Sequence, residues 1–166
     1  MIASIDPGLA GAISIIDSQK KIHGIYPMPL IGKELNVSKI TEILADTSVT
    51  YISLELVHAI FGCSAAATFS FGKNFGILLG ILPNLKKPFG LITPKDWQKI
   101  AHVGTSPKEK AKVRSLQAFN RLFPDQLHFL TKNKKVNEGL IDATLIGYAT
   151  SINLYGGNSR IHQSLS

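Results

Sequence analysis

The sequence predicts an α/β fold in which a mixed sheet is flanked by helices. The N-terminal part contains three short strand-like runs joined by turns, which is typical of an antiparallel meander. After it, apolar strand-like runs alternate with helical patterns, as in the βα units of parallel sheets. A chain of 166 residues with a hydrophobic fraction of 45% suits one packed domain. We therefore expect a single domain over residues 1–155 and a flexible tail over residues 156–166.

The strands of the meander are predicted at residues 1–6, 11–17 and 21–26. An Asp-Pro-Gly sequence bends the chain after the first strand, and a Ser-Gln-Lys turn follows the second. Pro27 and Pro29 end the third strand, since proline cannot donate a backbone hydrogen bond to a sheet.

Two further strands are predicted at residues 49–55 and 89–92, and helices at residues 37–45, 64–82, 106–122 and 138–154, with a short helix from Thr93-Pro94. The strand at 49–55 is apolar throughout, as expected for a central strand buried on both faces. The helix at 64–82 is rich in Ala and Leu, and we expect it to be buried. Ser106, Pro107 and Glu109 together form a capping box that predicts the start of the helix at 106–122.

The composition favours a polyanionic partner. The formal net charge is +7 and the pI is about 9.6, which indicates nucleic acid before membrane, although a basic protein without such a partner fits the charge equally well. Cys63 is the single cysteine, so a disulfide framework within the chain and a Cys-rich zinc site are both excluded. We expect a cytoplasmic protein without a signal peptide and without a membrane partner, because the apolar window at 61–82 is interrupted by polar residues.

Four carboxylates stand where a domain usually has apolar residues or neutral caps: Asp6, Glu55, Glu138 and Asp142. Asp6 and Glu55 each end a strand-like run, so both emerge from one sheet edge if the strands are neighbours. Glu138 and Asp142 are four residues apart and lie on one side of a helix. Clustered carboxylates repel one another unless a cation joins them, and Mg²⁺ and Mn²⁺ prefer oxygen ligands. The set therefore predicts a site for two such ions, an arrangement used for phosphodiester hydrolysis.

Each carboxylate also has an ordinary structural explanation. Asp6 precedes a Pro-Gly turn, Glu55 can be solvated at a strand end, and Glu138 is stabilised by the dipole at a helix N-terminus. Asp142 is explained least well in this way, because the helix around it is otherwise apolar. The combination is more specific than any of its members.

Basic residues supply candidate DNA contacts. The predicted helix at 106–122 carries Lys108, Lys110, Lys112 and Arg114 with few acidic partners, which favours a phosphate-binding edge over an ordinary solvated face. Lys73, between two aromatic residues, can also reach a phosphate. His58 lies three residues after Glu55, where it can contact the scissile strand, stack on a base or pack in its loop.

With these residues placed, the chain resembles the RuvC family of Holliday-junction resolvases within the RNase H-like superfamily, over about residues 2–149. The segments that carry the resemblance are Ile5-Asp6-Pro7-Gly8, Leu54-Glu55-Leu56-Val57-His58, Phe71-Gly72-Lys73-Asn74-Phe75-Gly76, Thr93-Pro94-Lys95-Asp96-Trp97, Ser106-Pro107-Lys108-Glu109-Lys110 and Gly139-Leu140-Ile141-Asp142-Ala143. The Phe-Gly-Lys segment is closer to phage-encoded members than to the cellular enzyme.

The resemblance implies a five-stranded mixed sheet, a homodimer, and Asp6, Glu55, Glu138 and Asp142 as the four metal ligands. It places Lys110 near the scissile phosphate, Gln98 or Lys99 near another phosphate, and His58 where some members have an aromatic wedge. The chain departs from the family at the third ligand, which is often Asp or His and often three residues before the last Asp. Glu138 is four residues before Asp142, within one helical turn, and its longer side chain extends its reach.

The sequence thus predicts a metal-dependent endonuclease that resolves four-way DNA junctions by symmetric hydrolysis, as in DNA recombination and repair. One alternative is an RNase H-like nuclease for other branched DNA or RNA–DNA hybrid, and another is a non-catalytic junction-binding protein. A sugar-kinase-like or actin-like ATPase also begins with Asp-x-Gly after a strand, but such proteins need two lobes and this chain has room for one.

Overall fold

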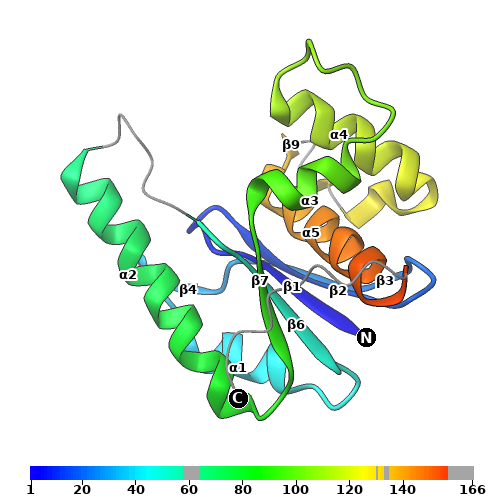
Figure 1. The fold of residues 1–166 in the computed structure, drawn as a ribbon. Coiled ribbons are helices and arrows are strands. Elements are labelled where there is room, and N and C mark those ends of the chain that lie inside the picture. The colour runs from blue at the N-terminus through cyan, green and yellow to red at the C-terminus, as the bar shows by residue number, and fades with distance from the viewer. Residues whose placement is uncertain (58–63, 130, 133–134, 157–166) are drawn as a thin grey trace.

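The computed structural model describes residues 1–57, 64–129, 131–132 and 135–156. Its main sheet consists of β1 (Ile2–Asp6), β2 (Ala12–Ile16), β3 (Ile22–Pro27), β6 (Tyr51–Glu55) and β7 (Phe89–Ile92). The spatial order is β3-β2-β1-β6-β7 (Figure 1). Strands β1, β2 and β3 pair antiparallel, whereas β6 is parallel to both β1 and β7. The predicted five-stranded mixed sheet is confirmed.

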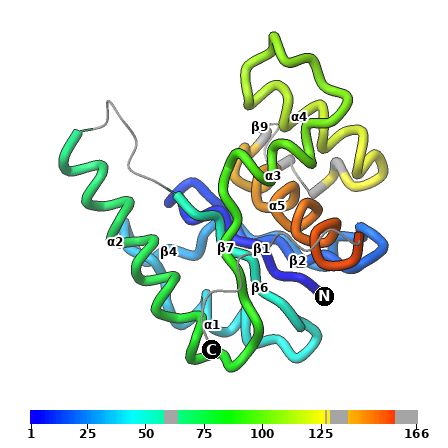
Figure 2. Tube along the Cα trace, in the orientation of Figure 1, coloured from blue at the N-terminus to red at the C-terminus, as the bar shows by residue number. Residues whose placement is uncertain are grey.

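Helices cover both faces of this sheet. One face packs on α1 (Val37–Ala45) and α2 (Ala65–Ile81), and the other on α3 (Pro94–Ala101), α4 (Ala111–Leu122) and α5 (Glu138–Tyr155) (Figure 2). Because side chains alternate along a strand, β1 sends Ala3 and Ile5 to the first core and Ser4 toward α5. The result is a three-layer α/β domain with one core on each side of the sheet.

Several short elements fall where the sequence predicts loops. A hairpin of β4 (Leu30–Ile31) and β5 (Glu34–Leu35) follows β3, and a second hairpin joins β8 (Thr131–Lys132) to β9 (Lys135–Val136). The 3₁₀ turns η1 (Leu82–Leu85) and η2 (Pro124–Phe129) follow α2 and α4. Runs as short as these carry too little periodicity to be recognised in the sequence.

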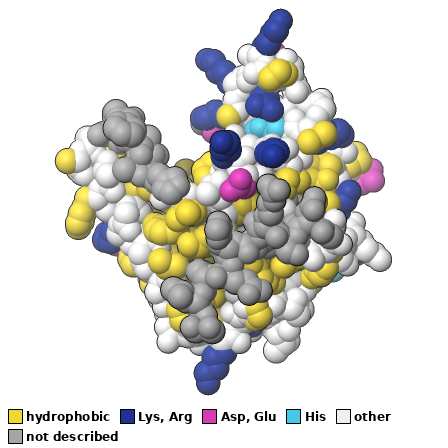
Figure 3. Space-filling model, viewed as in Figure 1, with side chains coloured by type: hydrophobic (Ala, Val, Ile, Leu, Met, Phe, Trp, Pro, Cys, Tyr) yellow, Lys and Arg dark blue, Asp and Glu magenta, His cyan; other side chains and the backbone are white. Residues whose placement is uncertain are grey.

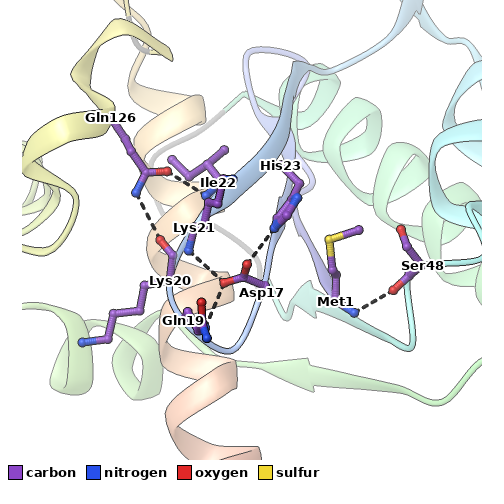
Figure 4. A network of polar contacts seen from close by, with 9 residues as sticks. All are labelled: Met1, Asp17, Gln19, Lys20, Lys21, Ile22, His23, Ser48 and Gln126. Carbon is purple, nitrogen blue, oxygen red and sulfur yellow. Dashed lines mark hydrogen bonds and ion pairs between the residues drawn. The ribbon is translucent and has the colours of Figure 1, made fainter.

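A polar network holds the β2–β3 turn and fixes η2 to it (Figure 4). The Asp17 carboxylate accepts a hydrogen bond of 3.0 Å from the Lys21 backbone N–H, and its second oxygen lies 2.7 Å from His23 Nε2. Gln126 of η2 accepts a hydrogen bond of 2.7 Å from the Ile22 backbone N–H. The network thus ties the segment after α4 to the edge strand of the sheet.

Two helices begin with an asparagine cap. The Asn36 side chain accepts from the Lys39 N–H at 3.1 Å at the start of α1, and Asn137 accepts from the Gly139 N–H at 3.0 Å at the start of α5. Both side chains satisfy backbone donors that the first helical turn leaves unpaired.

The predicted start of the basic helix is wrong. Helix α4 begins at Ala111, and the capping-box residues form an isolated turn in which the Glu109 N–H bonds to the Ser106 carbonyl at 3.2 Å. Residues 106–112 contain no large apolar side chain, so nothing anchors that first turn to the core. Lys108 and Lys110 therefore lie in the loop before α4 and not on a helix face.

The prediction that residues 64–82 form a buried helix is also wrong in part. The helix is present and Ser64 caps it, but only Asn74, Leu78 and Ile81 are buried, and Phe69 is 74% exposed. By length and composition alone, Ala65–Leu85 would qualify as a membrane-crossing helix, with 22% of the window buried. The N-terminal half of α2 thus presents apolar side chains to solvent.

Helix α5 lies close to β1 and to the loop that follows it. A Cβ atom on Gly139 would come within 2.2 Å of the Ala10 carbonyl oxygen, and one on Gly147 within 2.6 Å of Ser4 Oγ. Ser4 Oγ donates a hydrogen bond of 2.7 Å to the Ala143 carbonyl between these two glycines. The small residues Gly139, Ala143 and Gly147, spaced four apart, therefore allow the short distance between α5 and β1.

Buried hydroxyls then fix where α5 stands along the strands. Ser14, Ser4 and Ser53 are register partners across β2, β1 and β6. Thr144 Oγ1 donates to Ser14 Oγ at 3.1 Å, and Thr150 Oγ1 donates to Ser53 Oγ at 2.8 Å. Because a buried hydroxyl is costly without a partner, these bonds disfavour sliding of α5 over the sheet.

Candidate metal centre

Two of the predicted ligands end adjacent parallel strands. Asp6 is the last residue of β1 and Glu55 the last residue of β6, and these strands run parallel with Ile5 opposite Leu54. The next position in this register places Asp6 beside Glu55. Side chains alternate along strands, so both carboxylates are on the α5 side of the sheet, as are the serines two residues before them.

The loop after β1 folds tightly around Asp6. The Gly8 backbone N–H donates to Asp6 Oδ1 at 3.2 Å. A Cβ on Gly11 would lie 2.9 Å from Asp6 Cγ and 2.2 Å from the Asp6 carbonyl oxygen, so the loop closes at a position where only glycine fits. The same loop receives Gly139 at the start of α5, which brings Asp142, one turn further along, toward the strand ends.

Burial raises the pKa values of three carboxyl groups, and neighbouring charges raise them further in Glu55 and Asp142. Burial, followed by the nearby charges of Asp6 and Asp142, raises the pKa of Glu55 to about 7 against the lowering effect of its hydrogen bond from Trp97. Burial, followed by the charges of Asp6 and Glu138, raises the pKa of Asp142 to about 6. Burial also raises the pKa of Asp6, although the bond from Gly8 opposes it. The three carboxyl groups therefore form one electrostatically coupled cluster.

The cluster has the chemistry of a hard-cation site. Within the described part of the chain, the buried atom Asp142 Oδ1 has no hydrogen-bond partner, which leaves a carboxylate oxygen free for a ligand. A divalent cation would offset the burial and the repulsion that disfavour ionisation in this cluster. As they stand, no three His, Cys, Asp or Glu side chains in residues 1–57, 64–129, 131–132 and 135–156 are gathered closely enough to hold a metal ion. The donor set fits such an ion, and its members would have to draw together around it.

The fourth predicted ligand lies apart from the buried cluster. Glu138 is the first residue of α5, its side chain is 56% exposed, and its Oε2 atom is 2.6 Å from Lys112 Nζ. The ammonium group of Lys112 thus takes the position of a counter-ion for Glu138. Glu138 still acts on the cluster, since its charge contributes to the raised pKa of Asp142.

Two residues that act on the cluster from α3 and α4, Trp97 and Ser115, were not predicted from the sequence. Trp97 is 2% exposed, and its indole Nε1–H donates to Glu55 Oε1 at 2.6 Å. Its ring meets the buried His102 ring edge-on, with centroids 5.5 Å apart. His102 Nε2 lies 3.1 Å from Ser115 Oγ, and a hydrogen bond with the Ser115 side chain lowers the pKa of Asp142. The one available signal was that a buried tryptophan needs an acceptor for its N–H.

The predicted DNA-binding residues are spread around the cluster. Lys99, Lys108 and Lys110 are exposed on α3 and the loop before α4. Arg114 Nε donates to Thr105 Oγ1 at 3.0 Å, and Lys73 on α2 pairs with Glu34 at 2.5 Å. Figure 3 shows Lys and Arg side chains gathered on the lobe formed by α3 and α4, and the surface is hollowed between this lobe and α2. His58 lies outside the described residues.

The topology defines the class of fold as RNase H-like. Among solved structures, the chain is similar to Thermus thermophilus RuvC in complex with a Holliday junction substrate, with 14% identity over 94% of this chain and 95% of that one and a TM-score of 0.66. A further Thermus thermophilus RuvC structure gives 15% identity over 93% and 96% of the two chains and a TM-score of 0.62.

The resolvase of Fowlpox virus, in complex with Holliday junction DNA, is similar at 18% identity over 91% of this chain and 99% of that one, with a TM-score of 0.51. No protein-family model and no curated protein matches the sequence. The resemblance to RuvC is therefore confirmed as a likeness of fold along nearly the whole chain.

Proposed function

We propose that this protein is a metal-dependent endonuclease that cuts four-way DNA junctions. One observation carries the proposal: three coupled carboxyl groups, Glu55 buried and the other two partly buried, lie where β1, β6 and the first turns of α5 meet in an RNase H-like fold, and one of their oxygens lacks a partner among the described residues. The likeness of fold to two junction-bound resolvases supports the choice of substrate.

Asp6, Glu55 and Asp142 would hold two Mg²⁺ ions, or Mn²⁺, with Glu138 as the fourth ligand once it leaves Lys112. Bound cations of this kind supply positive charge beside the scissile phosphate and make a bound water more acidic. The chain contributes the strand-end carboxylates, which would draw together around the cations, in a site flanked by α3 and α5. Phosphodiester hydrolysis would leave 5′-phosphate and 3′-hydroxyl ends.

The basic residues would bind the phosphates of the junction arms. Lys99, Lys108, Lys110 and Arg114 lie on the lobe of α3 and α4, and Lys73 lies across the hollow on α2. Lys112 is positioned to exchange its contact with Glu138 for one with a phosphate when cations enter. Such contacts depend on shape and charge more than on base sequence, which suits a branched substrate. His58 would add a contact at the junction.

We propose further that the active form is a homodimer. A symmetric junction requires two nicks related by a two-fold axis, and a two-fold dimer carries two sites related in the same way. The exposed face of α2, with Phe69 in its N-terminal half and with open space beside Gly72, Gly76 and Gly80 along the helix, is the surface we assign to a second copy. A dimer that covers this surface agrees with a cytoplasmic protein that has no membrane partner.

A panel of labelled substrates with the same sequence arms tests the proposal. Incubation with Mg²⁺ is expected to cut the four-way junction and to leave linear duplex intact, and Glu55→Gln is expected to bind the junction without cutting it. Equal cutting of duplex or of RNA–DNA hybrid would replace the resolvase with a broader nuclease. Tight junction binding without cleavage in either Mg²⁺ or Mn²⁺ would identify a binding protein instead.

A further inference from the structure

Trp97 reaches Glu55 because of how the chain leaves the sheet. In β7, Ile92 is the register partner of Glu55 in β6. The next residue, Thr93, caps α3 by accepting from the Asp96 N–H at 3.2 Å, and Pro94 begins the helix. Trp97 is the fourth residue of α3. The chain thus turns at the end of β7 and, one helical turn later, lies over Glu55, the last residue of the neighbouring strand β6.

The contact between the two side chains is specific. An indole N–H can only donate, and Glu55 Oε1 receives it at 2.6 Å in a place where Trp97 is 2% exposed. A carboxylate that accepts such a bond through one oxygen is restricted in its rotation about the terminal torsion. The direction of the second oxygen, Glu55 Oε2, is then set before a cation binds. In metal proteins, outer partners of this type orient the ligands and change metal affinity about 10- to 100-fold.

Core packing alone does not require this arrangement. Trp97 belongs to the apolar cluster of α3, α4 and α5, and a phenylalanine would fill much of the same space. What phenylalanine lacks is the N–H group aimed at Glu55. The role of the indole nitrogen is therefore separable from that of the ring.

We propose that Trp97 is a positioning residue for the metal site, which fixes the Glu55 carboxylate through its indole N–H. This inference rests on the proposed function, because it assigns Glu55 to cation binding. It concerns binding of the cation by the free protein, so it is measured without DNA and without cleavage.

The first test compares Mn²⁺ binding by wild type and Trp97→Phe, measured as the loss of the free-ion signal in electron paramagnetic resonance. We expect Trp97→Phe to weaken Mn²⁺ binding by about 10- to 100-fold. The control is Thr150→Val, which removes one buried hydrogen bond between a helix and the sheet, but whose partner is Ser53 and not one of the three carboxylates. It should bind Mn²⁺ as wild type does. A folded Trp97→Phe protein with wild-type Mn²⁺ affinity would overturn the proposal.

A double substitution shows whether Trp97 acts through Glu55. If it does, Trp97→Phe has no further effect on Mn²⁺ binding in a protein that already carries Glu55→Gln. An equal further loss in that background would show that Trp97 acts elsewhere and would overturn the proposal.

A second measurement does not need the Trp97→Phe protein to fold. Trp97 is the single tryptophan of the chain, so an ¹⁵N–¹H spectrum contains one indole signal and needs no assignment. Titration with Mg²⁺ should move this signal saturably in wild type and leave it unmoved in Glu55→Gln. An indole signal that stays in place while Mg²⁺ binds by calorimetry would contradict the proposal.

Failure of the positioning role and failure of the proposed function would give different results. Wild-type protein that binds Mn²⁺ with a dependence on Trp97 but cuts no junction would retain the positioning role and reject the proposed function. Wild-type protein that binds no Mn²⁺ at millimolar concentration would overturn both.

Discussion

Replacement of Glu55 by Gln should stabilise the metal-free protein above neutral pH. In the folded protein the pKa of Glu55 rises from its ordinary value of 4.5 to about 7, mainly because of burial. Each pKa unit of difference between the folded and unfolded states corresponds to about 1.4 kcal/mol. Ionised Glu55 therefore lowers the free energy of unfolding by about 3 kcal/mol, and a neutral amide removes this cost while its oxygen can still accept from Trp97.

The sign of the pH dependence follows from proton binding. Below about pH 4.5 Glu55 is protonated in both states and costs nothing. As the pH rises, the unfolded chain releases its proton first, so the free energy of unfolding falls until about pH 7, where the folded protein releases its proton too. The difference between Glu55→Gln and wild type should therefore grow through this window and then stay constant.

Urea unfolding in the presence of a chelator, followed by circular dichroism, measures the effect. Between about pH 5 and about pH 8, the advantage of Glu55→Gln should increase by roughly 2–3 kcal/mol. Saturating Mg²⁺ should stabilise wild type and reduce that advantage, because the cation binds the folded state. The control is Glu42→Gln, an exposed carboxylate on α1, which should show no such trend. A pH-independent difference between Glu55→Gln and wild type would refute the assignment of Glu55 to a buried, coupled cluster.

Three further predictions concern the site and the helices that form it. The Mg²⁺ concentration for half-maximal cleavage should rise steeply as the pH falls from about 7 to about 6, because protonated Glu55 and Asp142 cannot bind a cation; a flat dependence on pH would contradict this. Lys112→Ala should free Glu138, so calorimetry should show tighter Mn²⁺ binding, while gel-shift assays show weaker junction binding; unchanged values in both would leave the ion pair without a role. Gly139→Ala should destabilise the fold or displace α5, because its Cβ would meet the Ala10 carbonyl oxygen at 2.2 Å. Gly80→Ala has nothing near its Cβ and should raise the free energy of unfolding by about 1 kcal/mol. Thermal unfolding compares the two variants, and a tolerated Gly139→Ala would refute the close approach of α5.

Local signals in the sequence were sufficient for most of the fold. Alternation and turn residues locate β1 to β3, a continuous apolar run identifies the central strand β6, and helical spacing predicts α1 and α5. These features are determined by neighbours in the chain. The start of α4 was misplaced because a capping box forms a helix only where an apolar face follows to hold it.

The candidate site was predictable only up to the strand ends. Asp6 and Glu55 could be placed together because parallel neighbours end at one sheet edge. The pairing of Glu138 with Lys112 depends on how α4 approaches α5, and the bond from Trp97 to Glu55 depends on the turn after β7. Both contacts join residues far apart in sequence, and no local pattern encodes them.

The exposure of the N-terminal half of α2 could not be predicted from its amino-acid composition. An Ala- and Leu-rich helix was expected to be buried, yet Phe69 is 74% exposed in the described part of the chain. Hydrophobicity predicts that such a surface is covered, but does not say by what. We assign the cover to a second copy of the chain, which sedimentation of wild type and Phe69→Lys would test through the loss of a dimer in the variant.

Cleavage of a four-way junction labelled on each strand in turn tests the central claim most directly. Wild-type protein with Mg²⁺ is expected to nick two opposed strands at symmetric positions, and Asp6→Asn, with its shape preserved, is expected to bind the same junction and leave every strand whole. Equal nicking by Asp6→Asn, or cleavage that persists in a chelator, would show that the carboxylate cluster is not the metal-dependent active site.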